Sequence, residues 1–154
     1  HLIHLDWNHF TMNMIGLVLC IIVFRNDVSI RHWPASFLFI SIFSSLCMYF
    51  TYFSYERYLG FSDVLHGWIL LGAFAIAAKE GRLSLIIVVL FWLKIAEENL
   101  ELTFFTSYGV SGNVARESHI YGAVGGTLYA LLFFPDFRKT LWALAKQPAV
   151  SSGK

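Results

Sequence analysis

Ser62 and His119 are two residues of this chain whose types fit a hydrolytic site. Ser62 lies in the stretch YLGFSDVLHG, two residues after Gly60 and directly before Asp63. A serine at the start of a helix is first of all a helix cap, and the preceding glycine permits a tight turn and a close backbone approach. The same serine becomes a nucleophile when a histidine lies beside it as a general base. Both interpretations of Ser62 stay open on the local sequence.

His119 opens the stretch HIYGAVGGTLYA, in which Gly122 and Gly126 follow at i+3 and i+7. At about 100° per residue, these three residues lie within a stripe about 60° wide on a helix. Small residues on one face let a neighbouring helix approach closely. The pattern therefore predicts that His119 is pressed against another helix, either as an interfacial histidine or as a general base.

Other polar residues also lie within apolar surroundings. His9 and Asn13 are spaced i, i+4 and share one helix face, where they can link helices or donate hydrogen bonds to a developing oxyanion. His66 follows Ser62 by four residues and can be a metal ligand, a second base or an aromatic plate. The sequence contains no HExxH motif and no haem attachment motif, so we expect neither a metal nor a cofactor.

The composition is that of a membrane protein. Of the 154 residues, 57% are hydrophobic and 14% are charged, whereas a soluble domain carries about 25% charged residues. A net charge of +1 offers no basic patch for a phosphate backbone, which argues against a nucleic-acid partner. Cys20 and Cys47 both lie in apolar runs, which argues against a disulfide scaffold or a cysteine-ligated zinc.

Five apolar stretches predict an all-α, polytopic membrane protein with a single domain over residues 1–154. A helix needs about 20 residues to cross a bilayer, and several of these stretches are slightly shorter. A cytoplasmic tail is expected over residues 135–154. The stretches cover residues 9–24, 34–53, 62–78, 83–96 and 119–134.

The positions of Lys and Arg predict the orientation of these spans. Two lie between the first and second spans, two between the third and fourth, and four after the fifth, whereas the opposite side carries Arg57 and Arg116. Lys and Arg accumulate on the cytoplasmic side of membrane proteins. We therefore expect Ser62 and His119 to begin their spans at the outer face.

The order of these motifs resembles the rhomboid family of intramembrane serine proteases, and the resemblance covers nearly the whole chain. The motif residues, in order, are His4, His9, Asn13, Gly60, Ser62, His119, Gly122 and Gly126. More narrowly, GFSDVLHGWILLGA, WLKIAEENLE and ESHIYGAVGG resemble the rhombosortase branch. Those bacterial members are thought to process secreted proteins that carry a C-terminal GlyGly-CTERM tail.

The resemblance implies a rhomboid-like helical bundle in which Ser62 attacks a peptide carbonyl and His119 is the base. The pair would be a dyad with no third carboxylate. The oxyanion hole would comprise His9, Asn13 and the backbone N–H of Ser62. The family core has six spans, so the span absent from the five seen here would be the first.

Three other positions carry weaker implications. His66 stands where many rhomboids have a tyrosine that stacks under the catalytic histidine, and it can stack or add a hydrogen bond. His4 matches a structural histidine that braces the outer loop. Asp63 replaces the glycine that usually follows the serine, and it either caps the helix or raises the basicity of a nearby histidine.

The resemblance predicts a protease of the bacterial inner membrane, with its site open to the periplasmic side. Its partners would be the lipid bilayer and transmembrane substrates with a Gly-Gly sorting tail. Two other classes stay open: a rhomboid-like binding protein without catalysis, and a small metal-binding or transport protein. Lys94 and Glu98 form an i, i+4 pair that we expect to be structural, and Glu97 is a bracing or substrate-side residue.

Overall fold

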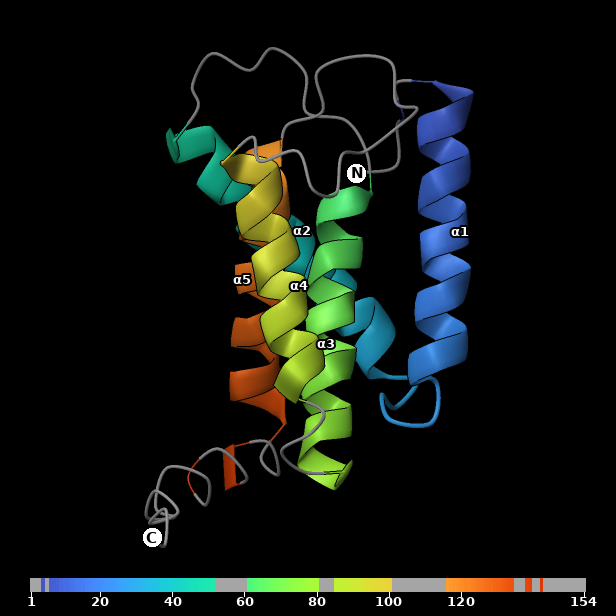
Figure 1. The fold of residues 1–154 in the computed structure, drawn as a ribbon, viewed down its shortest axis with the longest axis vertical. Helices are drawn as coiled ribbons and strands as arrows, with labels where there is room; N and C mark the ends of the chain where they lie inside the picture. Colours follow the sequence, from blue (N-terminus) through green and yellow to red (C-terminus); the bar gives the residue numbers. More distant parts are fainter. Residues whose placement is uncertain are drawn as a thin grey trace, which may run out of the picture.

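The computed structural model describes a bundle of five helices. The described residues are 4, 6–51, 61–80, 85–100, 116–134, 138–139 and 142, and they contain no strand. The helices are α1 (Trp7–Phe24), α2 (His32–Thr51), α3 (Ser62–Glu80), α4 (Leu85–Asn99) and α5 (Arg116–Phe133). They alternate in direction, so that α1, α3 and α5 begin at the end of the bundle where α2 and α4 finish (Figure 1). We call this end the site end. The predicted all-α bundle is confirmed.

Three helices reach further toward the site end than the apolar stretches indicated, and α1 does so by two residues, since it begins at Trp7 instead of at residue 9. α4 continues to Asn99 instead of ending at residue 96. α5 begins at Arg116 instead of at residue 119, so that His119 lies inside its first turn. Glu and Arg are good helix formers, so a helix continues through them after the apolar residues end. The extensions of α4 and α5 place charged side chains on helices rather than in connections.

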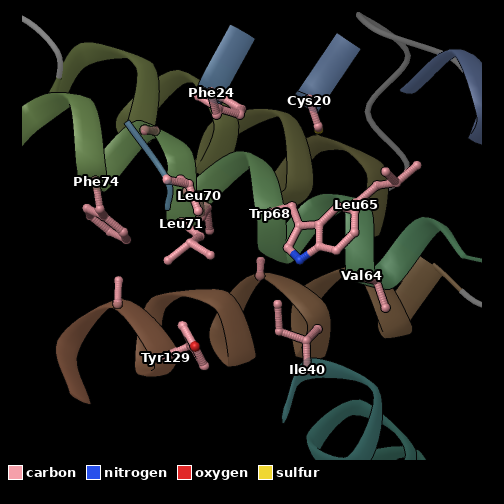
Figure 2. Close-up of a cluster of buried hydrophobic side chains, with 14 of the residues drawn as sticks. Cys20, Phe24, Ile40, Val64, Leu65, Trp68, Leu70, Leu71, Phe74 and Tyr129 are labelled. Atoms are coloured by element: carbon pink, nitrogen blue, oxygen red, sulfur yellow. The ribbon is translucent and has the colours of Figure 1, made fainter. Parts of the chain in front are cut away.

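α3 forms the centre of the bundle and contacts each of the other four helices. Thirteen of its 19 residues are buried, as expected for a helix that is apolar on all sides. Figure 2 shows Trp68, Leu71 and Phe74 of α3 among side chains from neighbouring helices. Because α3 is enclosed over most of its length, its first residue, Ser62, is carried by the most constrained element of the fold.

α3 and α5 approach each other closely along a stripe of glycines. A side chain at Gly122 would collide with the backbone carbonyl of Asp63, and a side chain at Gly126 would collide with that of Gly67. This is the close approach that the glycine stripe predicted. The offset between the helices is the same at both contacts, so they run in parallel, and His119 lies level with the beginning of α3.

The outward faces of α1, α2 and α4 are apolar. Many side chains on these faces are at least half exposed, among them Ile15, Val18, Ile42 and Leu90. For a soluble protein this would be an extensive apolar surface. Among the described residues, α1 and α2 are long and apolar enough to cross a bilayer. α4 has 15 residues and is about 22 Å long at 1.5 Å per residue, shorter than the roughly 30 Å hydrocarbon core.

Candidate active site

The beginnings of α3 and α5 bring Ser62 and His119 together at the site end. The Oγ atom of Ser62 lies 3.0 Å from the Nε2 atom of His119. The histidine is 8% exposed, while the serine is only partly buried. When Nε2 carries no proton, the serine hydroxyl donates to it. This is the geometry in which a histidine can accept the proton of a serine nucleophile.

A carboxylate contacts the other nitrogen of the histidine. The Oε2 atom of Glu98 lies 3.1 Å from the Nδ1 atom of His119, and the Glu98 side chain is 7% exposed. This contact corrects the expectation of a dyad with no third carboxylate. The sequence reading ended the fourth span at residue 96, but α4 continues through Glu98, and its last turn therefore places this carboxylate against α5.

Lys94 joins the other oxygen of the same carboxylate to His66. The Nζ atom of Lys94 is 2.5 Å from the Oε1 atom of Glu98 and 3.0 Å from the Nε2 atom of His66. The Nδ1 atom of His66 is 2.6 Å from the backbone carbonyl oxygen of Ser62. The His66 ring also stacks on the ring of His119, with 4.0 Å between centroids and 11° between planes. Stacking and an added hydrogen bond were both expected of His66.

In a comparison with known protein families, residues 1–136 of this chain match the Rhomboid domain. The chain belongs to the rhomboid family. The match includes all five described helices. No curated protein and no solved structure matches the chain. The rhomboid family comprises intramembrane proteases, so the bundle is a membrane bundle and its apolar outer faces contact lipid.

Within this rhomboid bundle, the register between α1 and α3 sets the level of Asn13 along the helices relative to the serine. Gly16 of α1 packs against the side chain of Leu65 of α3. Both helices begin at the site end and run in the same direction (Figure 1). Counting three residues back along each helix places Asn13 level with Ser62.

Asn13 and His9 lie on the inner face of α1. They are 5% and 4% exposed, respectively, in a helix whose other face is apolar and exposed. The Nδ2 atom of Asn13 is buried and has no hydrogen-bond partner among the described residues. A buried amide without a partner is unusual, and it is free to donate to a ligand at the site.

The N-terminus of α1 fixes the position of His9. The side chain of Asp6 caps the helix and accepts a hydrogen bond of 2.7 Å from the backbone N–H of His9. The ring of His4 packs edge-on against the His9 ring, with 5.3 Å between centroids. His4 therefore supports His9. The bracing of an outer loop, which the resemblance implied for His4, concerns residues outside the described ones.

Asp63 and Gly60 complete the set of candidate residues. Asp63 is fully buried in the first turn of α3, where a carboxylate is favourable to the helix dipole. Its backbone carbonyl faces Gly122, so the residue helps to form the close contact between α3 and α5. Gly60 lies outside the described residues.

His66, Glu98 and His119 also form a possible metal cluster, because one ligand atom from each lies within 4.8 Å of the others. The ammonium group of Lys94, however, already contacts both Glu98 and His66. A metal ion would have to displace this positive charge. The side chains present are therefore better suited to a hydrogen-bonded cluster than to metal binding.

The contact between Glu98 and His119 was missed by the sequence reading. Glu98 was recognised there only as the i, i+4 partner of Lys94. A usable signal was the presence of a carboxylate directly after an apolar stretch in a membrane protein, since such residues are rarely without a function. Glu97 is buried as well, so the sequence alone did not say which glutamate faces the histidine.

Proposed function

We propose that this rhomboid protein is an active intramembrane serine protease, with Ser62 as its nucleophile and His119 as its general base. The observation that carries the proposal is the 3.0 Å contact between Ser62 Oγ and His119 Nε2. A binding protein derived from the same fold would have no need of this contact. The family to which the chain belongs acts on transmembrane proteins within the bilayer.

The proposed reaction follows the general course of serine hydrolysis. The oxygen of Ser62 bonds to the scissile carbonyl carbon while its proton moves to Nε2 of His119. As the C–N bond breaks, the same nitrogen donates the proton to the leaving amine. Water then attacks the acyl-enzyme, His119 accepts a proton from the water, and the Ser62 hydroxyl is restored when the acyl bond breaks.

The oxyanion would be held by donors from two helices. The backbone N–H of Ser62 lies at the beginning of α3, where the first amides of a helix have no partner within the helix. Asn13 and His9 would add side-chain donors from α1. In a site of low dielectric, such preorganised donors contribute strongly to catalysis.

We propose further that the substrates are proteins with a C-terminal transmembrane tail preceded by a Gly-Gly sequence. A glycine disfavours helix by about 1 kcal/mol relative to alanine, so a Gly-Gly site would unwind more readily into an extended strand. This assignment to the rhombosortase branch is supported by the stretches around Ser62, Glu98 and His119.

The proposed location is the bacterial inner membrane, with the site open to the periplasmic side. Arg25, Arg31 and Lys79 all lie at the end of the bundle opposite the site end, where α1 finishes, α2 begins and α3 finishes. Positive residues mark the cytoplasmic side, which supports this orientation.

Labelling with a fluorophosphonate probe tests the proposed nucleophile. Wild-type protein should be labelled, because an activated serine displaces fluoride from the probe and becomes phosphonylated, and Ser62→Ala should not be labelled. Equal labelling of the two proteins would exclude the protease proposal.

A second experiment compares a Gly-Gly-tailed substrate with the same substrate carrying Leu-Leu at that site. Cleavage of the first at least tenfold faster supports the branch assignment, and equal rates would contradict it.

Asn13→Ala should reduce kcat by about 10²–10³-fold, the usual effect of removing one oxyanion donor, with little change in KM. Thr11→Ala is the matched control, because Thr11 is on the exposed face of α1 and its hydroxyl bonds to the carbonyl of Trp7. Cleavage rates at saturating substrate measure both. A kcat for Asn13→Ala within about threefold of wild type would remove Asn13 from the oxyanion hole.

A further inference from the structure

The hydrogen bonds around His119 form a closed ring of five contacts among five side chains and one carbonyl. In order, Ser62 Oγ contacts His119, His119 contacts Glu98, Glu98 contacts Lys94, Lys94 contacts His66, and His66 contacts the carbonyl of Ser62. Only α3, α4 and α5 contribute to it. The ring therefore links three helices at the point where the proposed reaction takes place.

The chemistry of each group fixes where every proton lies. An ionised carboxylate only accepts hydrogen bonds, and an ammonium only donates them. Nδ1 of His119, facing the carboxylate of Glu98, must therefore carry a proton. When the imidazole of His119 is neutral, its Nε2 atom therefore carries a lone pair, which is directed at the hydroxyl of Ser62.

The same reasoning applies to the second histidine. Nε2 of His66 faces the ammonium of Lys94 and must accept, so its Nδ1 carries the proton and donates to the carbonyl of Ser62 at 2.6 Å. The ammonium of Lys94 and the carboxylate of Glu98 carry opposite charges, so this pair adds no net charge to a site enclosed in a membrane bundle, where an unpaired charge is costly.

The two oxygens of Glu98 have different partners. Oε1 faces Lys94 on the same helix, at 2.5 Å, and Oε2 faces His119 on α5, at 3.1 Å. A pair that only stabilised α4 would need just the first contact. The second contact connects the carboxylate to the reacting histidine.

We propose that Glu98 is a positioning residue for His119 and is itself held in place by Lys94. It selects the tautomer of His119 in which Nε2 can accept the proton of Ser62. This inference rests on the proposed function and adds a third member to its catalytic pair. The carboxylate keeps the proton on Nδ1 and stabilises the imidazolium that forms during attack, without itself taking the proton.

The proposal makes an unusual prediction for Glu98→Gln. An amide has one oxygen and one NH₂ group. Because the ammonium of Lys94 must face the oxygen, the NH₂ group of the new side chain would face His119 and donate to Nδ1. The proton of His119 would then move to Nε2, and the imidazole could no longer accept a hydrogen bond from the Ser62 hydroxyl. Glu98→Gln should therefore reduce kcat by about 10³–10⁴-fold, as expected for the wrong tautomer, with KM within about twofold of wild type.

A double variant distinguishes this role from a structural one. Lys94→Met combined with Glu98→Gln removes the ammonium, so the amide can rotate and accept from Nδ1 of His119. The double variant should recover at least tenfold in kcat over Glu98→Gln alone. A purely structural role predicts a lower kcat for the double variant than for Glu98→Gln, because the second substitution removes one more contact from the hydrogen-bonded ring. Glu80→Gln is the control for loss of a carboxylate, because Glu80 is exposed at the end of α3 opposite the site end, and it should keep kcat within about threefold.

These outcomes separate the two proposals. If wild type is labelled at Ser62 but Glu98→Gln retains kcat within about threefold, the role of Glu98 is excluded while the protease proposal stands. A double variant slower than Glu98→Gln also excludes the role. If wild type is not labelled at Ser62, the protease proposal itself fails. The double variant is compared with Glu98→Gln per folded molecule, counted by circular dichroism, so that partial unfolding of either variant does not imitate a change of tautomer.

Discussion

His119→Ala should reduce the rate of peptide cleavage by about 10⁴–10⁶-fold, the range found when a serine hydrolase loses its base. Without the imidazole of His119, no group within hydrogen-bond distance of Ser62 Oγ among the described residues could accept its proton. The measurement is single-turnover cleavage of a transmembrane substrate in detergent or bicelles. The double variant Ser62→Ala/His119→Ala should be no slower than either single variant within about threefold, because both residues act in one step.

His32→Ala is the control for this experiment. His32 also lies at a helix terminus and contacts a partner on α5, since its Nδ1 is 3.0 Å from the hydroxyl of Tyr129. It lies at the end of the bundle opposite the site end, and its loss should leave kcat within about threefold. Effects of Ser62→Ala and His119→Ala that multiply in the double variant would show that the two residues do not act as a unit.

Gly122→Ala should lower the free energy of unfolding by about 3 kcal/mol, at the upper end of what overpacking usually costs. The added methyl group would meet the backbone carbonyl of Asp63, and backbone cannot move aside as a flexible side chain does. α5 would have to shift away from α3, which would also lengthen the contact between Ser62 and His119. Loss of stability and loss of kcat should therefore occur together.

Gly125→Ala is the matched control on the same helix. Its methyl group would lie 3.2 Å from the ring of Phe43 and 3.6 Å from the next atoms, so small movements relieve it. Alanine also favours helix over glycine by about 1 kcal/mol, and Gly125→Ala should be close to neutral. Unfolding midpoints in mixed micelles measure both variants. Equal midpoints would show that α3 and α5 do not depend on the glycine contact.

Much of the bundle was predictable because membrane helices carry simple signals. Long apolar stretches indicated the helices, and the polar residues within them, His9 and Asn13, pointed inward because lipid cannot satisfy them. The small residues after His119 indicated which face of that helix would meet a neighbour. The helix ends were less well predicted, since Glu and Arg allow α4 and α5 to continue beyond their apolar residues.

The site was predictable only in part. Ser62 and His119 were identified from their spacing to glycines and from the family resemblance, and the stacking of His66 on His119 was implied by that resemblance. The partner of His119 was not foreseen. α4 is apolar on nearly every side, so its sequence does not indicate how it rotates against α5.

By itself, the sequence determined that this protein is an all-α membrane bundle of the rhomboid type with a serine and a histidine at the beginnings of two helices. The tertiary structure decided that the two meet at 3.0 Å, and that Glu98 rather than Glu97 contacts the histidine. The physical reason is that apolar patterning fixes which residues enter the membrane, whereas the rotation of each helix is fixed by contacts between helices. Those contacts, above all the glycines of α5 against the carbonyls of α3, are what bring the site together.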